Sequence, residues 1–399
     1  MRTRLLAAAM ALTATPLAAQ EAEPDFGTFR EQFRIDAVAA GISPNLYDEQ
    51  MATVKPLPVI LKRNDNQPEF VRPLWDYVDG ALAEARIRGG LEGYASEADL
   101  LNTIEAEYGV DAETLVAIWG MESSFGRIMG DEDVLSALST LAYQGRRQSF
   151  GRTQLIAALR ILQNGDARRE QLQGSWAGAM GQTQFIPTTY LAHAVDHDGD
   201  GKKDLWSDRG DVFASTANYL SRSGYRADLP WGFEVVLPEG FDFARADRSV
   251  ARSVAHWQSA GVTRPGGALS DRIDLNETVS IILPAGANGP AFLVTDNFRA
   301  ILRYNNATAY ALAVGFLSDA VAGRSQPLAN DWPRDDRPLT LAERKALQEA
   351  LSGLGYEPGP VDGIIGAGTR KALRSWQRDN GLPADGYASA LILSRLMGA

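Results

Sequence analysis

The sequence predicts a mainly α-helical (α+β) protein with a small β-containing lobe and a separate three-helix module at its C-terminal end. Apolar residues recur at three- and four-residue spacings from Phe29 to about Tyr225, which is the period of amphipathic helices. Short β-branched segments bounded by proline or glycine, such as Phe233–Leu237 and Val279–Leu283, lie within residues 230–295 and are typical of strands. The composition, 45% hydrophobic and 22% charged over 399 residues, is ordinary for a folded globular protein.

The first nineteen residues are predicted to be a secretory signal peptide. Arg2 and Arg4 precede the apolar run Leu5–Leu12, and small residues up to Ala19 offer a cleavage site. A membrane anchor is the alternative, but the apolar stretch contains Pro16 and is shorter than the roughly 20 residues that a spanning helix needs. We therefore expect export to the periplasm as a soluble protein without a lipid anchor.

The next boundary lies near residue 324. After the β-containing lobe, the helical period returns around Asn297–Val321. Residues 324–338 are polar, contain three prolines and lack an apolar period, which predicts a linker. The sequence therefore divides into a large domain over residues 20–323, this linker, and a module over residues 339–399.

The module is predicted to contain three short helices. Thr340 and Glu343 have the spacing of a capping box, which opens the first helix. The apolar stripe of that helix is expected to include Leu347, Ala350, Leu351 and Leu354, the second helix to point Leu373 and Trp376 inward, and the third to carry Leu391 and Leu396.

Composition excludes several classes of function. The chain has 39 Lys and Arg residues against 50 Asp and Glu residues, a formal net charge of −11, which argues against a nucleic-acid-binding protein. The absence of cysteine excludes disulfide scaffolds, thiol nucleophiles, cysteine-ligated metal sites and a lipidated cysteine. The three histidines, His193, His197 and His256, leave little room for histidine chemistry.

Glu122 is the candidate catalytic residue. It is expected in the last turn of a helix capped by Asp111, and it follows Leu115, Ile118 and Trp119 by seven, four and three residues. This spacing places its carboxyl group on the apolar stripe of the helix. Burial and the negative end of the helix dipole both raise the pKa of a carboxyl group, so Glu122 could act as a general acid. The alternative is a glutamate whose stem packs and whose head reaches solvent or caps the following turn.

Three motifs resemble those of lytic murein transglycosylases, in particular the membrane-bound lytic transglycosylase B family in a soluble, non-lipidated form. Residues 119–127, WGMESSFGR, resemble the glutamate–serine motif of that family. Residues 175–187, SWAGAMGQTQFIP, resemble its glycine-rich motif, and residues 303–305, RYN, followed by Tyr310, resemble its tyrosine–asparagine motif. The C-terminal sixty residues, with Asp362, Gly363, Gly366 and Thr369, resemble the common peptidoglycan-binding module. The resemblance implies a lysozyme-like helical catalytic domain that acts on peptidoglycan glycan strands.

The resemblance also assigns roles to individual residues. It makes Glu122 the sole catalytic acid and base, and it implies that Ser123 and Ser175 orient groups nearby. The residues implied to line the glycan groove and bind substrate are Gln184, Phe185, Tyr219, Tyr304, Asn305 and Tyr310. Amides suit sugar hydroxyl and N-acetyl groups, and aromatic rings suit the apolar faces of pyranoses. Each aromatic residue could instead belong to the core.

The implied reaction needs one carboxyl group and no catalytic cofactor. A common glycoside hydrolase uses a second Asp or Glu, and the family uses none of Asp131, Glu132 and Asp133 in that role. The resemblance implies that Glu122 protonates the oxygen between N-acetylmuramic acid and N-acetylglucosamine and then deprotonates the muramyl 6-hydroxyl, which forms a 1,6-anhydro end. A hydrolytic muramidase and a catalytically silent peptidoglycan-binding scaffold are the alternatives.

A second motif predicts a structural calcium site. Asp196, Asp198 and Asp200 occupy positions 1, 3 and 5 of an EF-hand-like loop with glycine at position 6, and oxygen ligands of this kind suit Ca²⁺. Lys202, at position 7, is included among the ligands. Position 12 is serine rather than glutamate, and the resemblance makes Asp211 the residue that closes the site. The alternative is a turn rich in Gly and Asp that holds no metal.

Overall fold

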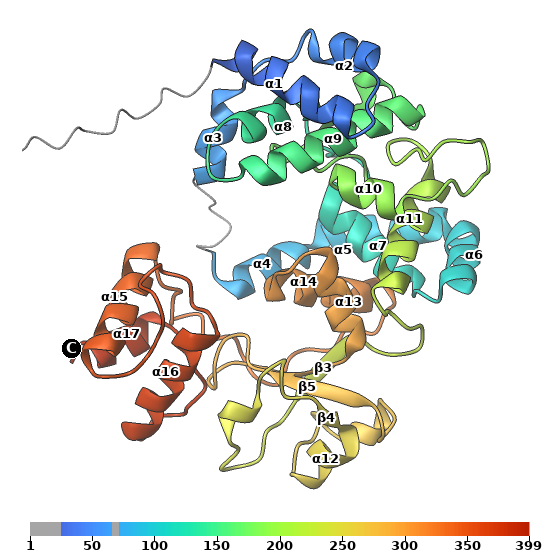
Figure 1. Cartoon of the computed structure of the whole chain (residues 1–399). Coiled ribbons are helices and arrows are strands. Elements are labelled where there is room, and N and C mark those ends of the chain that lie inside the picture. The colour runs from blue at the N-terminus through green and yellow to red at the C-terminus, as the bar shows by residue number, and fades with distance from the viewer. Residues whose placement is uncertain (1–24, 66–71, 399) are drawn as a thin grey trace, which may run out of the picture.

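The computed structural model describes residues 25–65 and 72–398, which form helical lobes, a β lobe and a C-terminal helical module (Figure 1). The predicted mainly helical fold with a small sheet is confirmed. The predicted signal peptide lies outside the described residues. No described helix combines the length and apolarity that crossing a membrane requires.

The upper lobe in Figure 1 packs around α8, whose residues Val134 to Ala142 are all buried. A helix that is apolar on every side is stable only inside a core. Asp133 begins α8, and its carboxylate accepts a hydrogen bond of 3.0 Å from the amide of Ser136. The helices of this lobe are α1 (Phe26–Ala39), α2 (Pro44–Met51), α3 (Pro58–Asp65), α8 (Val134–Tyr143) and α9 (Gln148–Asn164).

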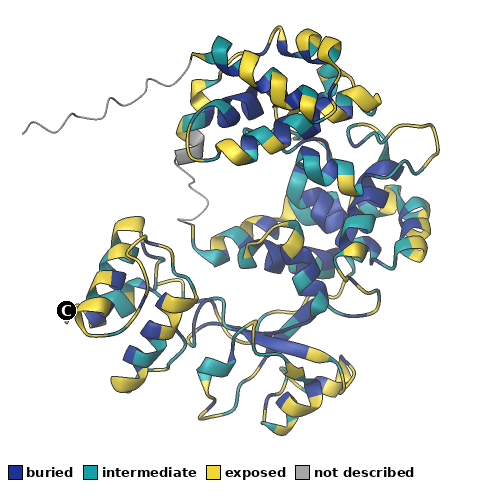
Figure 2. Ribbon diagram, in the orientation of Figure 1, coloured by how far each residue is buried: buried dark blue, intermediate teal, exposed yellow. Residues whose placement is uncertain are grey.

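The central lobe is built around two mostly buried helices, α7 and α14, which pack against each other (Figure 2). The helices of this lobe are α4 (Leu74–Ala81), α5 (Glu84–Ser96), α6 (Ala98–Tyr108), α7 (Ala112–Ser123), α11 (Arg209–Arg222), α13 (Asp296–Tyr304) and α14 (Thr308–Val321). Between the two lobes, α10 (Pro187–His193) packs mainly against α9 and also contacts α11. Asp111 precedes α7 as predicted, but its side chain does not cap the helix. Its carboxylate accepts from the Tyr225 hydroxyl at 2.8 Å, and Glu105 accepts from the amide of Ala112 instead.

The β lobe holds a four-stranded antiparallel sheet in the order β3-β6-β5-β4. Its strands are β3 (Gly232–Val235), β4 (Arg252–Ser253), β5 (Thr278–Ile282) and β6 (Ala291–Val294), with the short helix α12 (Val254–Ser259) beside β4. The two strands predicted from sequence correspond to β3 and β5 within one or two residues. A second, two-stranded ladder pairs β1 (Glu132–Asp133) with β2 (Gln173–Gly174) and was not predicted.

The C-terminal module consists of α15 (Leu341–Gly353), α16 (Ala367–Asp379) and α17 (Ala390–Leu396). The predicted capping box between Thr340 and Glu343 is present. Two residues predicted to face inward are exposed: Leu354 lies just beyond the end of α15, and Leu391 lies in the first turn of α17. Helix spacing places a residue on a face only within the helix itself, so a stripe cannot be extended past the last turn.

The predicted linker contains no helix or strand, yet it is held against the β lobe. Trp332 is buried against Phe292, with ring centroids 6.1 Å apart. The amides of Ala329 and Asn330 donate to the Glu234 carboxylate at 2.6 and 3.0 Å. The module beyond it also contacts this lobe, because Asp385 accepts from the amide of Ala287 at 2.7 Å. The module therefore has a fixed place beside the β lobe.

Gly315 in α14 offers a test of the packing between the central lobe and the β lobe. A Cβ atom there would lie 2.4 Å from the ring of Trp231, so we expect Gly315→Ala to lower the free energy of unfolding by about 1–3 kcal/mol through overpacking. A Cβ atom on Gly80 in α4 would instead point into open space, with no neighbour within 4 Å. Gly80→Ala should therefore raise stability by about 0.5–1 kcal/mol. Urea denaturation of both variants checks the pair, and equal effects would contradict the packing described.

Candidate active site

The end of α7 is fixed by an unusual turn. Ser124, Phe125 and Gly126 follow Glu122 closely and have φ angles of 49°, 62° and 77°, a left-handed conformation that residues other than glycine rarely adopt. The amide of Gly126 donates to the Ser123 hydroxyl at 3.0 Å. The turn is thus capped by Ser123, and the Glu122 carboxylate is not needed for this role.

Aromatic packing holds this turn in place. The ring of Phe125 folds back against Trp119 with centroids 5.3 Å apart at an interplanar angle of 86°. Its place requires glycine at two positions, because a Cβ atom on Gly89 or Gly120 would lie 2.7 Å from the ring. Strained turns persist where the surrounding packing determines them, and they often occur at functional sites.

Glu122 projects toward α14, where its Oε1 atom accepts a hydrogen bond of 2.6 Å from the Tyr310 hydroxyl. Burial raises the pKa of this carboxyl group from 4.5 to about 7, and the hydrogen bond from Tyr310 opposes the rise. A carboxyl group with a pKa near neutrality can both give and take a proton at physiological pH.

Tyrosines surround this carboxyl group. The Glu122 charge contributes to raised pKa values of Tyr77, Tyr304 and Tyr310, in each case after burial as the larger cause. The pKa of Tyr77 rises to about 12, so all three phenols remain neutral hydrogen-bond donors. Tyr77 lies on α4, 45 residues before Glu122, and no sequence motif pointed to it.

Three predicted groove aromatics form one cluster. The ring centroid of Tyr304 lies 5.1 Å from that of Tyr219 and 5.7 Å from that of Phe185. The Tyr304 hydroxyl donates to the carbonyl of Thr183 at 2.6 Å, and the Tyr219 hydroxyl donates to the carbonyl of Arg303 at 2.5 Å. Phe185 is buried, whereas Tyr219 and Tyr304 are half-buried, so the tyrosines offer the accessible part of the cluster.

The glycine-rich loop supplies two glutamines with different roles. Gln184 has a φ of 50°, and its Nε2 atom donates to the carbonyls of Met129 and Gly181, both at 2.9 Å. Gln182, which was not singled out from sequence, is buried. Its Oε1 accepts from the Trp119 indole at 2.7 Å and from Arg209. Gln182 thereby ties the loop to the helix that carries Glu122.

The other predicted site residues, Ser123, Ser175 and Asn305, do not share the hydrogen bond between Glu122 and Tyr310. Ser123 is buried, and its hydroxyl donates to the carbonyl of Trp119. The hydroxyl of Ser175 accepts from the amides of Ala177 and Ala179 within its own turn. Asn305 is exposed at the C-terminal end of α13. Both serines therefore shape loops that border the site.

Within the described residues 25–65 and 72–398, no second carboxylate shifts the pKa of Glu122. The two causes of that shift are burial and the hydrogen bond from Tyr310. Asp133 is engaged elsewhere. It caps α8 and pairs with Arg169, and the pairing lowers its pKa although burial opposes this. Asp131 is exposed.

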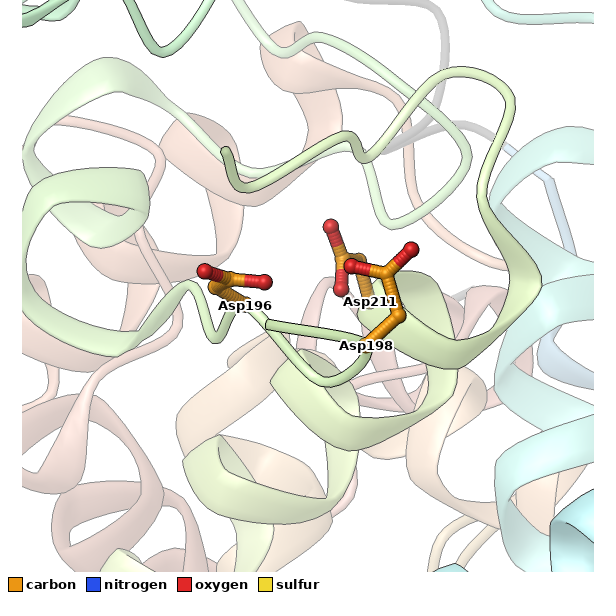
Figure 3. Close-up of side chains that lie close together, drawn as sticks. All are labelled: Asp196, Asp198 and Asp211. Atoms are coloured by element: carbon orange, nitrogen blue, oxygen red, sulfur yellow. The ribbon is translucent and has the colours of Figure 1, made fainter. Parts of the chain in front are cut away.

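The Asp-rich loop brings three carboxylates together (Figure 3). Oxygen atoms of Asp196, Asp198 and Asp211 all lie within 4.8 Å of one another. Asp200 is exposed and outside this group, and its Oδ1 accepts from the amide of Lys202 at 2.8 Å. Asp211 is buried, and its two oxygens accept from the amides of His197 and Asp204, both at 2.6 Å. Carboxylates this close suit a hard cation.

Comparisons with known proteins agree on the family. Residues 25–319 match the family model described as Transglycosylase SLT domain, and residues 340–396 match that of a Putative peptidoglycan binding domain. The membrane-bound lytic murein transglycosylase B of Escherichia coli is 31% identical over 298 residues, which are 71% of this chain and 79% of that protein.

Solved structures extend the likeness. SltB3 from Pseudomonas aeruginosa, crystallised in complex with NAG-anhNAM-pentapeptide, is 50% identical, with a TM-score of 0.90 over 93% of this chain and 99% of that one. The Escherichia coli lytic transglycosylase Slt35, in complex with calcium, is 30% identical, with a TM-score of 0.64 over 74% of this chain and 94% of that one.

The raised pKa of Glu122 predicts a dependence of stability on pH. A carboxyl group with a higher pKa in the folded state binds its proton more tightly there. Its contribution to the free energy of unfolding is therefore fully present below pH 4.5 and is lost as the pH rises through about 7. Glu122→Gln removes this loss and should be more stable than the wild type at pH 8, by about 3 kcal/mol, with little difference at pH 4.

Chemical denaturation at the two pH values checks this expectation. Glu92→Gln is the matched control, because Glu92 is an exposed glutamate on α5, and it should follow the wild type at both pH values. Equal stability of Glu122→Gln and the wild type at pH 8 would show that the Glu122 pKa is ordinary.

Proposed function

Because the chain belongs to the transglycosylase SLT family, and is a lytic transglycosylase that acts on peptidoglycan, we propose that Glu122 is its single catalytic acid and base. The bond cleaved is the β-1,4 bond between N-acetylmuramic acid and N-acetylglucosamine, and the product is a 1,6-anhydromuramyl end. The observation that carries this proposal is the place of Glu122 at the end of α7, where its carboxyl group accepts a hydrogen bond of 2.6 Å from Tyr310 and burial raises its pKa to about 7.

The first step breaks the glycosidic bond. The protonated Glu122 gives its proton to the bridging oxygen, the bond between this oxygen and the muramyl anomeric carbon breaks, and N-acetylglucosamine leaves with the electron pair. The muramyl N-acetyl group stabilises the cationic carbon. The Tyr310 hydroxyl then donates to a carboxylate rather than to a carboxylic acid, and a charge-assisted hydrogen bond is the stronger one.

The second step closes the anhydro ring. The Glu122 carboxylate takes the proton of the muramyl 6-hydroxyl, whose oxygen bonds to the anomeric carbon of the same residue. Attack within one sugar needs no second molecule and therefore gains the advantage of intramolecularity. Glu122 is again protonated, and no water has been consumed.

Hydrolysis is the competing reaction. It would require a second carboxylate that acts as a nucleophile or activates water. Asp133 is paired with Arg169 and caps α8, so it is poorly placed for this task. The engagement of Asp133 supports the mechanism with a single carboxyl group.

The groove is assigned to Gln184, Phe185, Tyr219, Tyr304, Asn305 and Tyr310. Support comes from the contacts that join Tyr219, Tyr304 and Phe185 into one wall near Glu122. Phenol edges and ring faces suit pyranoses. Ser123 and Ser175 act indirectly, by shaping the turns that border the groove.

We assign a structural Ca²⁺ to Asp196, Asp198 and Asp211. Three close carboxylates repel one another unless a cation compensates their charge, and the neighbouring acids Asp208 and Asp198 add to burial in raising the pKa of Asp211. Asp200 and the carbonyl of Lys202 would complete the set after a local movement of the loop. The ion would hold the segment before α11, which carries Tyr219.

The remaining assignments concern location and attachment to the wall. An exported protein would reach peptidoglycan in the periplasm, in agreement with the predicted signal peptide over residues 1–19. The module over residues 339–399 would hold the enzyme on the polymer, which raises the local concentration of the catalytic domain. Its contacts with the β lobe give that attachment a defined orientation.

Replacement of Glu122 tests the catalytic assignment. Glu122→Gln retains shape and can still accept from Tyr310 but carries no transferable proton. We expect turnover of purified peptidoglycan to fall at least about 10²–10⁴-fold while binding to the polymer persists. Wild-type products should be about 18 Da lighter than hydrolysed fragments, since no water is added. Mass spectrometry in water enriched in oxygen-18 reads this directly, and incorporation of the label would show hydrolysis.

Calcium should stabilise the folded protein. A ligand that binds only the folded state at 100 times its Kd adds about 2.7 kcal/mol, so the melting temperature of chelator-treated protein should rise with added Ca²⁺. Asp198→Asn should weaken this response, whereas Asp335→Asn, an exposed aspartate outside the loop, should preserve it. Identical melting curves with and without Ca²⁺ would show that the loop does not bind this ion.

A further inference from the structure

A wide, open surface cavity of about 740 Å³ lies beside the aromatic wall, and four of the residues that line it are arginines. Tyr219 belongs to both features, because its ring contacts Tyr304 on one side and its residue lines the cavity on the other. The cavity is lined by residues of α11, of α13 and of the segment of the β lobe before β4, together with His193 at the end of α10. Its charged lining consists of Arg222, Arg248, Arg299 and Arg303.

Most of this positive charge is not neutralised. Arg299 pairs with Asp296 at 2.9 Å and donates to the carbonyl of Arg248. Across the residues that the structure describes, no ion pair involves Arg222, Arg248 or Arg303. All three are exposed, so their guanidinium groups are accessible. The chain as a whole has a net charge of −11. Three arginines without ion pairs around one cavity therefore make this part of the surface unusually positive.

A neutral hydrogen-bonding residue completes the lining. The Nδ1 atom of His193 is buried without a hydrogen-bond partner, and its ring centroid lies 4.8 Å from that of Tyr219. Burial is the first cause and the Arg222 charge the second in lowering the pKa of His193, so histidine adds no competing positive charge near neutral pH. The cavity therefore offers several guanidinium forks and little that would attract a cation.

The chemistry of these groups selects a carboxylate ligand. Guanidinium groups bind carboxylates through two parallel hydrogen bonds, whereas sugar rings are neutral and are served by the tyrosines of the adjoining wall. The peptides that branch from the muramyl residues of peptidoglycan carry free carboxylates. A glycan strand lying along the aromatic wall would bring such a peptide to the edge formed by Tyr219.

We propose that Arg222, Arg248 and Arg303 bind the carboxylates of the substrate's peptide branches and make the enzyme prefer glycan whose peptides carry free carboxylates. This inference rests on the proposed function, because it places a second part of the same substrate next to the groove. Arg299 acts differently, since its own ion pair and its contact with Ser280 make it a support for the neighbouring backbone.

The experiment compares two substrates and three proteins. The substrates are a peptidoglycan tetrasaccharide with its peptides and the same tetrasaccharide with the peptide carboxylates converted to amides. Removal of the peptides by an amidase would instead leave a free lactyl carboxylate on each muramyl residue. The proteins are the wild type, the double variant Arg222→Gln/Arg248→Gln, and Arg252→Gln, an exposed arginine in β4 that does not line the cavity. The readout is the ratio of kcat/KM for the two substrates, and melting temperatures verify that each protein is folded.

The wild type should favour the substrate with free peptide carboxylates, and the double variant should lower the ratio by about 3- to 10-fold, as expected for the loss of two accessible charge-assisted contacts. Arg252→Gln should retain the wild-type ratio. Added salt should lower the ratio in the wild type more than in the double variant.

Several outcomes would overturn the inference. An unchanged ratio in the double variant, with both substrates still cleaved, would refute the carboxylate site and leave the proposed function intact. Failure of the wild type to form anhydro products from either substrate would refute the proposed function itself. Binding of the wild type to vesicles of anionic phospholipid, lost in the double variant while the ratio is unchanged, would assign the arginines to a lipid surface instead.

Discussion

The burial of one carboxyl group at the end of α7 is the constraint on which the rest of the catalytic domain depends. A buried carboxylate is unfavourable, so the group retains its proton to a higher pH, and the Tyr310 hydroxyl partly compensates the charge when the proton leaves. Both effects require α7 and α14 to meet at close range. Most residues of both helices are buried, and a turn with left-handed backbone angles ends α7 directly after Glu122 and Ser123.

The parts that support this carboxyl group come from segments far apart in the sequence. Gln182 joins the glycine-rich loop to Trp119, three residues before Glu122, and Tyr304 joins α13 to the same loop. Phe125 packs over Gly89 and Gly120, where any larger residue would displace it. Rigid support of this kind keeps a catalytic group in the geometry its reaction needs.

Electrostatics divides the molecule into regions with different partners. The chain as a whole is acidic, and the wall near Glu122 is made of neutral aromatic and amide groups suited to the neutral sugar rings of a polysaccharide. Positive charge gathers around the cavity next to Tyr219, and negative charge gathers in the loop of Asp196, Asp198 and Asp211. Each region therefore offers a different chemistry, and α11 contributes a residue to each of them: Tyr219 to the wall, Arg222 to the cavity and Asp211 to the acidic loop.

The sequence by itself determined the local features of this protein. The helical period, the capping box at Thr340, the two principal strands and the place of Glu122 in the last turn of an apolar helix depend on residues close in the chain, and so they could be read from spacing. Three motifs together also indicated the family.

Only the tertiary structure decided which of these residues meet. Tyr310 reaches Glu122 across 188 residues, Tyr77 joins them from a helix without a motif, Asp111 gives its carboxylate to Tyr225 rather than to its own helix, and the arginines of one cavity come from three separate elements. Spacing describes neighbours along one helix or strand, whereas burial, pKa and charge pairing arise between elements, and these depend on how the whole chain packs.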